Sequence, residues 1–180
     1  GQACCTLGDV GCYSLQFNKI ITSGEGGMVV TNQEEVWKRA CMYHDPIGAL
    51  RRGFATEELR YGINFRMSEM QGAIALVQLS KLDGLIGAMQ ERQKMLKAGM
   101  ADIAGRKGIA FRASNDAEGD AGVCSIFFME SPALAQNVAE ALNAENIGAS
   151  TLYARDDIDY HVYAHWVPII EQRAWSAGGD

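Results

Sequence analysis

The segment from Gln16 to Gly27 contains one lysine, Lys19, among mostly small and apolar neighbours. A lysine amine is nucleophilic only when it is neutral, and a partly desolvated site lowers its pKa toward that state. Such a lysine can form a Schiff base with a carbonyl compound. On position alone, a solvated loop lysine is the simpler interpretation. The residues around Lys19 must therefore decide between the two.

Two features near Lys19 favour chemistry. Ser14 stands five positions earlier and offers a hydroxyl that can hold a phosphate beside the lysine. Gly24, Gly26 and Gly27 follow, and glycines let a backbone approach a ligand or another chain closely. The lysine precedes the glycines and no Gly-Lys-Ser/Thr ending is present, so this is not a P-loop.

The elements that must position Lys19 are two short strands. Residues 9–15 alternate weakly, and residues 28–31 form a short apolar run that ends at Asn32. Both patterns predict strands, which we expect to be buried. The connection between them is too rich in glycine for a helix and too long for a tight hairpin. Long loops inside compact domains are often functional.

Helices are predicted after the second strand. Asn32 and Glu35 form an N-cap signature, and helical spacing continues until Pro46. Residues 47–66 show no sustained period and predict a long exposed connection. Ser68 and Gln71 then form a capping box that opens a long helix, which we expect to extend toward residue 100.

Two interior glycines of the long helix, Gly84 and Gly87, each cost about 1 kcal/mol relative to alanine. We expect a break near Asp83, and a domain boundary there. Further along, residues 123–130 predict a strand, and Ser131 followed by Pro132 predicts the start of a helix that closes near residue 148. Strands and helices together indicate an α/β chain.

Composition limits the kinds of partner. Of 180 residues, 48% are apolar and 21% charged, as in folded globular proteins. The net charge of −6 argues against nucleic acid or an anionic membrane as the main partner. No apolar run approaches the roughly 20 residues that cross a bilayer. Five cysteines without a CxxC pair favour a reducing compartment, and we expect a cytoplasmic protein with the cysteines buried as small hydrophobes.

Histidines and arginines supply weaker candidates. His161 and His165 have the i, i+4 spacing of a helical metal pair, but no third ligand is evident, so we predict no metal site. His44 stands at a predicted helix end, where the macrodipole already explains a cation. Arg66 adjoins the capping-box segment and could meet a phosphate or carboxylate of a substrate.

Three stretches of the chain resemble one known family. Residues 8–19 (GDVGCYSLQFNK) and 22–31 (TSGEGGMVVT) resemble the lysine segment of the DegT/DnrJ/EryC1/StrS sugar aminotransferases, which are pyridoxal-phosphate enzymes. Residues 62–79 (GINFRMSEMQGAIALVQL) are similar to the segment that opens that family's interdomain helix. The motifs occur in the family's order.

The resemblance implies specific roles. Lys19 would form the Schiff base with pyridoxal phosphate, Ser14 would hold the cofactor phosphate, and Asn64 would reach the phosphate in the neighbouring subunit's site. A homodimer with shared active sites is therefore implied. Arg66 and His44 are the candidates for substrate contact. The implied fold is α/β, of the aspartate aminotransferase type (fold type I), with residues 1–82 closing the large domain and 83–180 forming most of a small α/β domain.

The activity implied is transfer of an amino group from glutamate or glutamine to a keto sugar, which could be linked to a nucleotide. Family members that are dehydratases carry histidine in place of the lysine, so Lys19 favours transamination. The family's cofactor-binding acid and ring-stacking side chain precede the lysine segment, and we expect this chain to be the middle portion of such an enzyme. The alternative is a non-catalytic fragment or assembly module.

Overall fold

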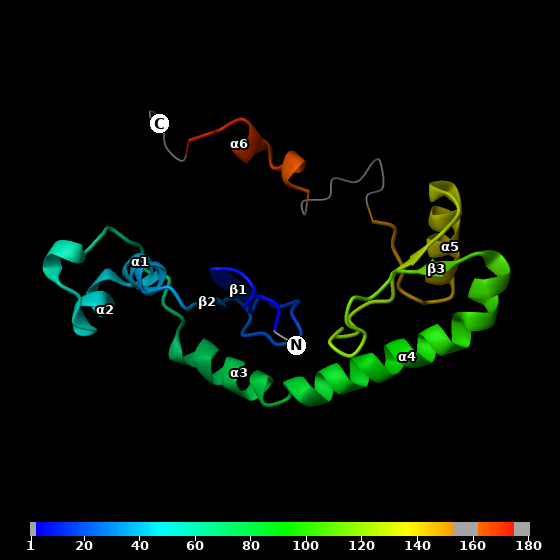
Figure 1. The fold of residues 1–180 in the computed structure, drawn as a ribbon, viewed down its shortest axis with the longest axis horizontal. Coiled ribbons are helices and arrows are strands. Elements are labelled where there is room, and N and C mark those ends of the chain that lie inside the picture. The colour runs from blue at the N-terminus through cyan, green and yellow to red at the C-terminus, as the bar shows by residue number, and fades with distance from the viewer. Residues whose placement is uncertain (1–2, 153–161, 175–180) are drawn as a thin grey trace. The chain divides into compact units, whose positions relative to one another are not determined.

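The computed structural model describes residues 3–152 and 162–174 of the chain, which combine helices with short strands (Figure 1). The chain divides into two compact units, Gly1–Arg92 and Gln93–Asp180. Each unit is described by itself below.

The first unit begins with the two predicted strands. β1 (Val10–Ser14) and β2 (Gly27–Thr31) pair antiparallel, with Ser14 opposite Gly27 at the end nearest the loop. The existence of both strands is confirmed. The expectation that they are buried is wrong, because the pair forms a two-stranded sheet whose residues are mostly exposed in the described chain.

Two helices follow β2. α1 (Glu34–His44) begins after Gln33, and no side chain caps it, so the predicted Asn32 cap is wrong although the helix is confirmed. Pro46 does not simply end a helix, since it opens α2 (Pro46–Arg51) at a position where its missing N–H costs nothing. A 3-10 turn, η1 (Thr56–Glu58), lies beyond. The predicted featureless connection over residues 47–66 is therefore only partly correct.

α3 (Glu69–Leu79) starts at the predicted capping box, which the structure confirms. α4 (Leu82–Lys107) continues after a bend of 50°, visible in Figure 1 where the two helices meet. The break lies at Ser80–Lys81, just before Asp83, which confirms the predicted break near that residue. The Ser80 hydroxyl donates to the Val77 carbonyl at 2.8 Å, which offers the backbone a local alternative to the helical pattern.

The interior glycines of α4 do not break it. Gly84 and Gly87 both lie in the first turns of the helix, and α4 runs beyond the expected residue 100. The cost of each glycine is evidently offset by the length of the regular helix around it. Among the described residues, no single helix is long and apolar enough to span a membrane, and only the bent α3–α4 pair taken together meets that criterion of length and composition.

The second unit contains the rest of α4 and the elements after it. These are β3 (Ala110–Phe111), β4 (Phe127–Phe128), α5 (Pro132–Ala144), a 3-10 turn η2 (Tyr163–His165) and α6 (Val167–Ile170). β3 and β4 pair antiparallel. β4 is much shorter than the predicted strand over 123–130. The predicted start of α5 is confirmed, since the Ser131 hydroxyl accepts from the Leu134 amide at 3.3 Å.

Few side chains are fully enclosed. The buried apolar residues of the first unit are Leu15, Met42 and Ala49, and those of the second are Ala104 and Ala139. The prediction that the cysteines are buried is wrong: Cys4, Cys5, Cys12 and Cys124 are exposed, Cys41 is half-buried, and all five are free. The described chain thus leaves much apolar surface uncovered.

Candidate functional site

The loop that carries Lys19 is closed at its base by Leu15. The Leu15 amide donates to the Gly26 carbonyl at 2.9 Å, and the Leu15 carbonyl accepts from the Ser23 amide at 3.1 Å and the Thr22 hydroxyl at 2.8 Å. The Leu15 side chain is 3% exposed. Residues 16–26 therefore form a compact loop with its own internal hydrogen bonds, rather than an open connection.

Lys19 lies in a tight turn of this loop. Its amide donates to the Gln16 carbonyl at 3.0 Å, which fixes the backbone at the lysine. The side chain is exposed. Lys19 is thus solvated in the described chain, as its position alone suggests, and the strands on either side are themselves mostly exposed. The turn fixes the backbone from which the Lys19 side chain extends.

Ser14 is the last residue of β1 and lies at the entrance to the loop. Its hydroxyl oxygen accepts from the Gln16 amide at 3.3 Å. That bond uses a lone pair, so the hydroxyl hydrogen is still able to donate to an anion. Both Ser14 and Lys19 are exposed.

The glycine-rich end of the loop is fixed by polar and apolar contacts. The Glu25 carbonyl accepts from the Ser23 hydroxyl at 2.8 Å and from Gln71 Nε2 at 3.1 Å. Gly26 has φ +141°, and a Cβ placed there would lie 3.1 Å from both the Met67 methyl carbon and the Ser23 hydroxyl. Glycine adopts this φ without strain, and any larger residue would also press on both side chains.

Asn64 lies in a segment that runs beside the end of α1. The Ile63 amide donates to the Tyr43 carbonyl at 3.0 Å, and the Phe65 amide donates to the His44 carbonyl at 3.1 Å. These bonds bring His44, itself half-buried, into the neighbourhood of Asn64. Backbone hydrogen bonds thus bring the predicted site residues His44 and Asn64 close together, although they are far apart in the sequence.

Arg66 joins Asn64 to Asp45, a neighbour of His44 that was not assigned to the site from the sequence. Its backbone N–H and its Nε both donate to Asn64 Oδ1 at 3.1 Å, and its Nη1 lies 3.4 Å from Asp45 Oδ2. The Asp45 side chain is 13% exposed and Arg66 is 52% exposed. The predicted site residues Asn64 and Arg66 are therefore brought together, with Asp45 as a third member.

Asp45 also faces the start of α2. The backbone N–H of Gly48 holds the pKa of the Asp45 carboxyl below its usual 3.8, and the cations of Arg66, His44 and Arg51 act in the same direction against the opposing effect of burial. A signal for this residue was present in the sequence, because Asp45-Pro46 has the same form as Ser131-Pro132: a capping residue followed by a first-turn proline.

The two halves of the predicted site meet only indirectly. Within the described residues, no hydrogen bond or ion pair joins Ser14 or Lys19 to Asn64. The segments are connected instead by the hydrogen bond from Gln71 to the Glu25 carbonyl and by the proximity of Met67 to Gly26. Gln71 was identified from the sequence as a capping residue only. Its second contact spans 46 positions and has no local sequence signature.

Other candidate sites gain little support. Residues from α1 and the stretch 58–61 line a groove of about 700 Å³, in which Lys38 is already paired with Glu34 and Glu58 at 3.4 Å. None of the predicted site residues lines this groove. In the part of the chain that the structure describes, no three His, Cys, Asp or Glu side chains could hold a metal ion together. His161 and the stretch 153–161 lie outside the described residues.

Comparison with known proteins identifies the family. The model of the DegT/DnrJ/EryC1/StrS aminotransferase family matches residues 1–174. The chain belongs to this family. It is 39% identical over 111 residues to a protein of Micromonospora echinospora provisionally named L-glutamine:3-amino-2,3-dideoxy-scyllo-inosose aminotransferase. It is 37% identical over 86 residues to GDP-perosamine synthase of Escherichia coli O157:H7.

Those two alignments cover 61% and 48% of this DegT-family chain and 26% and 23% of the relatives, so the chain spans about a quarter of their length. Among solved structures, it resembles the aminotransferase TlmJ from Streptoalloteichus hindustanus, with a TM-score of 0.69 at 23% identity, covering 86% of this chain and 41% of that one. A GDP-4-keto-6-deoxymannose-3-dehydratase solved with a trapped PLP-glutamate geminal diamine matches with a TM-score of 0.63 at 21% identity, covering 81% and 41%. The predicted family and α/β aminotransferase fold are confirmed.

Proposed function

We propose that the protein to which this chain belongs is a pyridoxal-phosphate-dependent aminotransferase that moves an amino group from glutamate or glutamine to a keto sugar. The observation that carries the proposal is the family match over residues 1–174. The resemblance of residues 8–31 to the family's lysine segment, and the closed loop that holds Lys19, support it. The names of the relatives, which include a glutamine-dependent aminotransferase and a sugar-nucleotide synthase, support the substrate classes.

The described residues fit pyridoxal phosphate. A phosphate needs hydrogen-bond donors, and Ser14 retains its hydroxyl hydrogen while Asn64 keeps its NH₂ edge free, because Arg66 occupies only the carbonyl edge. Lys19 offers an exposed primary amine for covalent attachment. When bound, the cofactor supplies an electron sink for the bonds at the amino-acid α-carbon.

Lys19 would serve the reaction in two ways. Its amine would hold the cofactor covalently between turnovers, and once displaced by the amino donor it would act as the base that takes the proton from the donor's α-carbon. A lysine is suited to both tasks only while its amine is neutral. Burial by other parts of the protein would promote that state, since the described chain leaves the side chain exposed.

We also propose His44 and Arg66 as the candidates for substrate contact. Arg66 is bonded to Asn64 and Asp45, which favours a positioning role over substrate contact. Transamination is preferred to dehydration because the resemblance implies that Lys19 takes the position at which dehydratases of the family carry histidine. The likeness to a solved dehydratase, at 21% identity, concerns the fold alone.

Assembly and location complete the proposal. A homodimer would let Asn64 serve the neighbouring subunit's site, and the exposed apolar residues of α3, such as Met70 and Leu76, support burial against further protein. We assign residues 1–82 to the large domain and 83–180 to the small one. The odd number of cysteines supports the reducing cytoplasm.

The proposal is tested by the covalent link at Lys19. Purified protein given pyridoxal phosphate should turn yellow, and borohydride should bleach it and leave the cofactor on the peptide that contains Lys19. Lys19→Ala should remove both the colour and the turnover of glutamate with a keto sugar, whereas the exposed Lys81→Ala should change neither. Wild-type-like turnover in Lys19→Ala would refute the assignment. A wild-type protein that stays colourless with added cofactor would favour the alternative, a non-catalytic assembly module.

A further inference from the structure

Gln71 uses both ends of its side-chain amide, and each end holds a different segment. Oε1 accepts from the Ser68 backbone N–H at 2.9 Å and from the Ser68 hydroxyl at 3.0 Å, which caps the start of α3. Nε2 donates to the Glu25 carbonyl at 3.1 Å, in the loop that carries Lys19. A capping residue needs only the first of these bonds.

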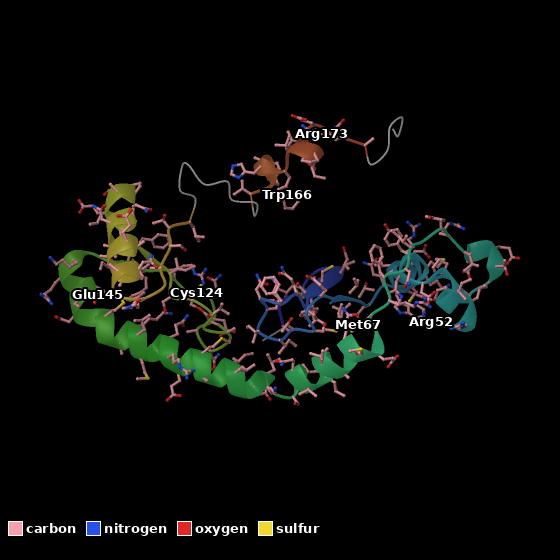
Figure 2. The ribbon with its side chains drawn as sticks, turned by 180° about the vertical axis from the view of Figure 1, so that it is seen from behind. Arg52, Met67, Cys124, Glu145, Trp166 and Arg173 are labelled. Atoms are coloured by element: carbon pink, nitrogen blue, oxygen red, sulfur yellow. The ribbon has the colours of Figure 1, made fainter. Side chains whose placement is uncertain are left out.

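A second contact joins the same two segments. Met67, labelled in Figure 2 just before α3, lies so close to Gly26 that a Cβ there would be 3.1 Å from its terminal methyl carbon. Glu25 and Gly26 are adjacent, and so the start of α3 meets this turn of the loop through one polar and one apolar contact. The Glu25 carbonyl is also held by the hydroxyl of Ser23, which is 6% exposed.

We propose that Gln71 is a positioning residue that fastens the Lys19 loop to the start of α3, and so fixes Lys19 relative to the segment that carries Asn64. The fastening of the loop does not depend on the proposed function. Only the effect of Gln71 on cofactor binding and catalysis rests on it. In a homodimer of the kind proposed above, one protomer's Lys19 and Asn64 would serve different sites. The Gln71–Glu25 bond would then help to position Lys19 in one active site and Asn64 in the other.

The test uses Gln71→Glu. A glutamate keeps an oxygen that can cap Ser68, and its charge suits the first turn of a helix. It cannot donate to the Glu25 carbonyl, and it places a carboxylate oxygen against that carbonyl instead. We expect the amides of Leu15, Lys19 and Ser23 to exchange with deuterium about tenfold faster, while the amides within α3 keep their protection. Cofactor affinity should fall by about tenfold.

Two variants separate the fastening bond from other effects. Gln78→Glu puts the same charge on α3 and should leave both measurements unchanged. Ser68→Ala weakens the cap without removing the donor to Glu25, and should loosen the first turn of α3 more than the loop. If Ser68→Ala accelerates loop exchange as much as Gln71→Glu does, or if Gln71→Glu leaves loop exchange unchanged, the inference is wrong.

The exchange measurement needs no cofactor. If the wild-type protein fails to bind pyridoxal phosphate, the proposed function fails while loop exchange in Gln71→Glu still decides the role of Gln71. If the loop opens but cofactor affinity stays unchanged, the fastening bond exists and its positioning role is rejected.

Discussion

Arg66 determines which edge of Asn64 is free. Its Nε and its backbone N–H both donate to Asn64 Oδ1 at 3.1 Å. Arginine has only donors, so the amide oxygen must face it and the NH₂ group must face away. Asn64 is thereby oriented to donate a hydrogen bond outward, which is the property that a phosphate ligand requires. The contact from Arg66 to Asp45 holds the arginine in place.

Replacing Arg66 should therefore weaken phosphate recognition. Lysine keeps the charge but lacks the fork that bonds Asn64 and Asp45 together. We expect Arg66→Lys to lower the affinity for pyridoxal phosphate by about tenfold and to leave the affinity for pyridoxal, which has no phosphate, nearly unchanged. Arg60→Lys is the matched control, since Arg60 bonds only the carbonyls of its own turn. Absorbance titration measures both ligands, and an equal loss for the two would contradict the role.

Ser14 gives a second test of the phosphate site. Ser14→Ala removes the hydroxyl donor, and we expect an affinity for pyridoxal phosphate about tenfold weaker or more. Ser14→Thr keeps the hydroxyl at the end of β1 and should retain most of the affinity. The fraction of Lys19 modified after borohydride treatment at limiting cofactor reports the difference. Equal modification in Ser14→Ala and wild type would remove Ser14 from the site.

Asp45 should make stability depend on pH in acid. Its folded pKa lies below the usual 3.8 because the Gly48 amide and the nearby cations favour the charged form. A carboxyl with a depressed pKa stabilises the fold at pH values above 3.8, and that contribution is lost as the pH falls through the folded value.

Asp45→Asn removes this contribution. The variant should be less stable than wild type at pH 7, and the difference should shrink below about pH 4, where the wild-type carboxyl becomes protonated. Urea midpoints measured across that range test the expectation. A difference that is the same at pH 7 and in acid would assign the effect to packing rather than to charge.

Local sequence signals predicted elements best where a side chain caps its own helix. Ser68 with Gln71 and Ser131 with Pro132 marked the starts of α3 and α5, because both patterns satisfy backbone groups within a few residues. The Asn32 prediction was wrong because a residue type that often caps helices, at the right spacing, does not by itself form a cap. The N-cap of α1 is Gln33, one residue later, and its side chain makes no capping hydrogen bond. The helix break occurs close to the predicted Asp83, but Gly84 and Gly87 lie inside α4 and do not cause it, because glycine lowers helix propensity without requiring a break.

Burial was harder to predict than secondary structure. The strands around Lys19 and the cysteines were expected to be enclosed, and in the described chain they are mostly exposed. An apolar composition shows that a segment can be buried, but it does not show which other part of the protein covers it. The ties that organise the candidate site, from Gln71 to Glu25 and from Arg66 to Asp45, cross 46 and 21 positions. Periodicity carries no information over such separations.

The main chain of Leu15 holds the lysine loop shut from within. Those bonds are made by backbone atoms and the Thr22 hydroxyl, and the exposed side chains of Phe17 and Asn18 take no part in them. Phe17 and Asn18 could therefore be replaced without opening the loop that carries Lys19.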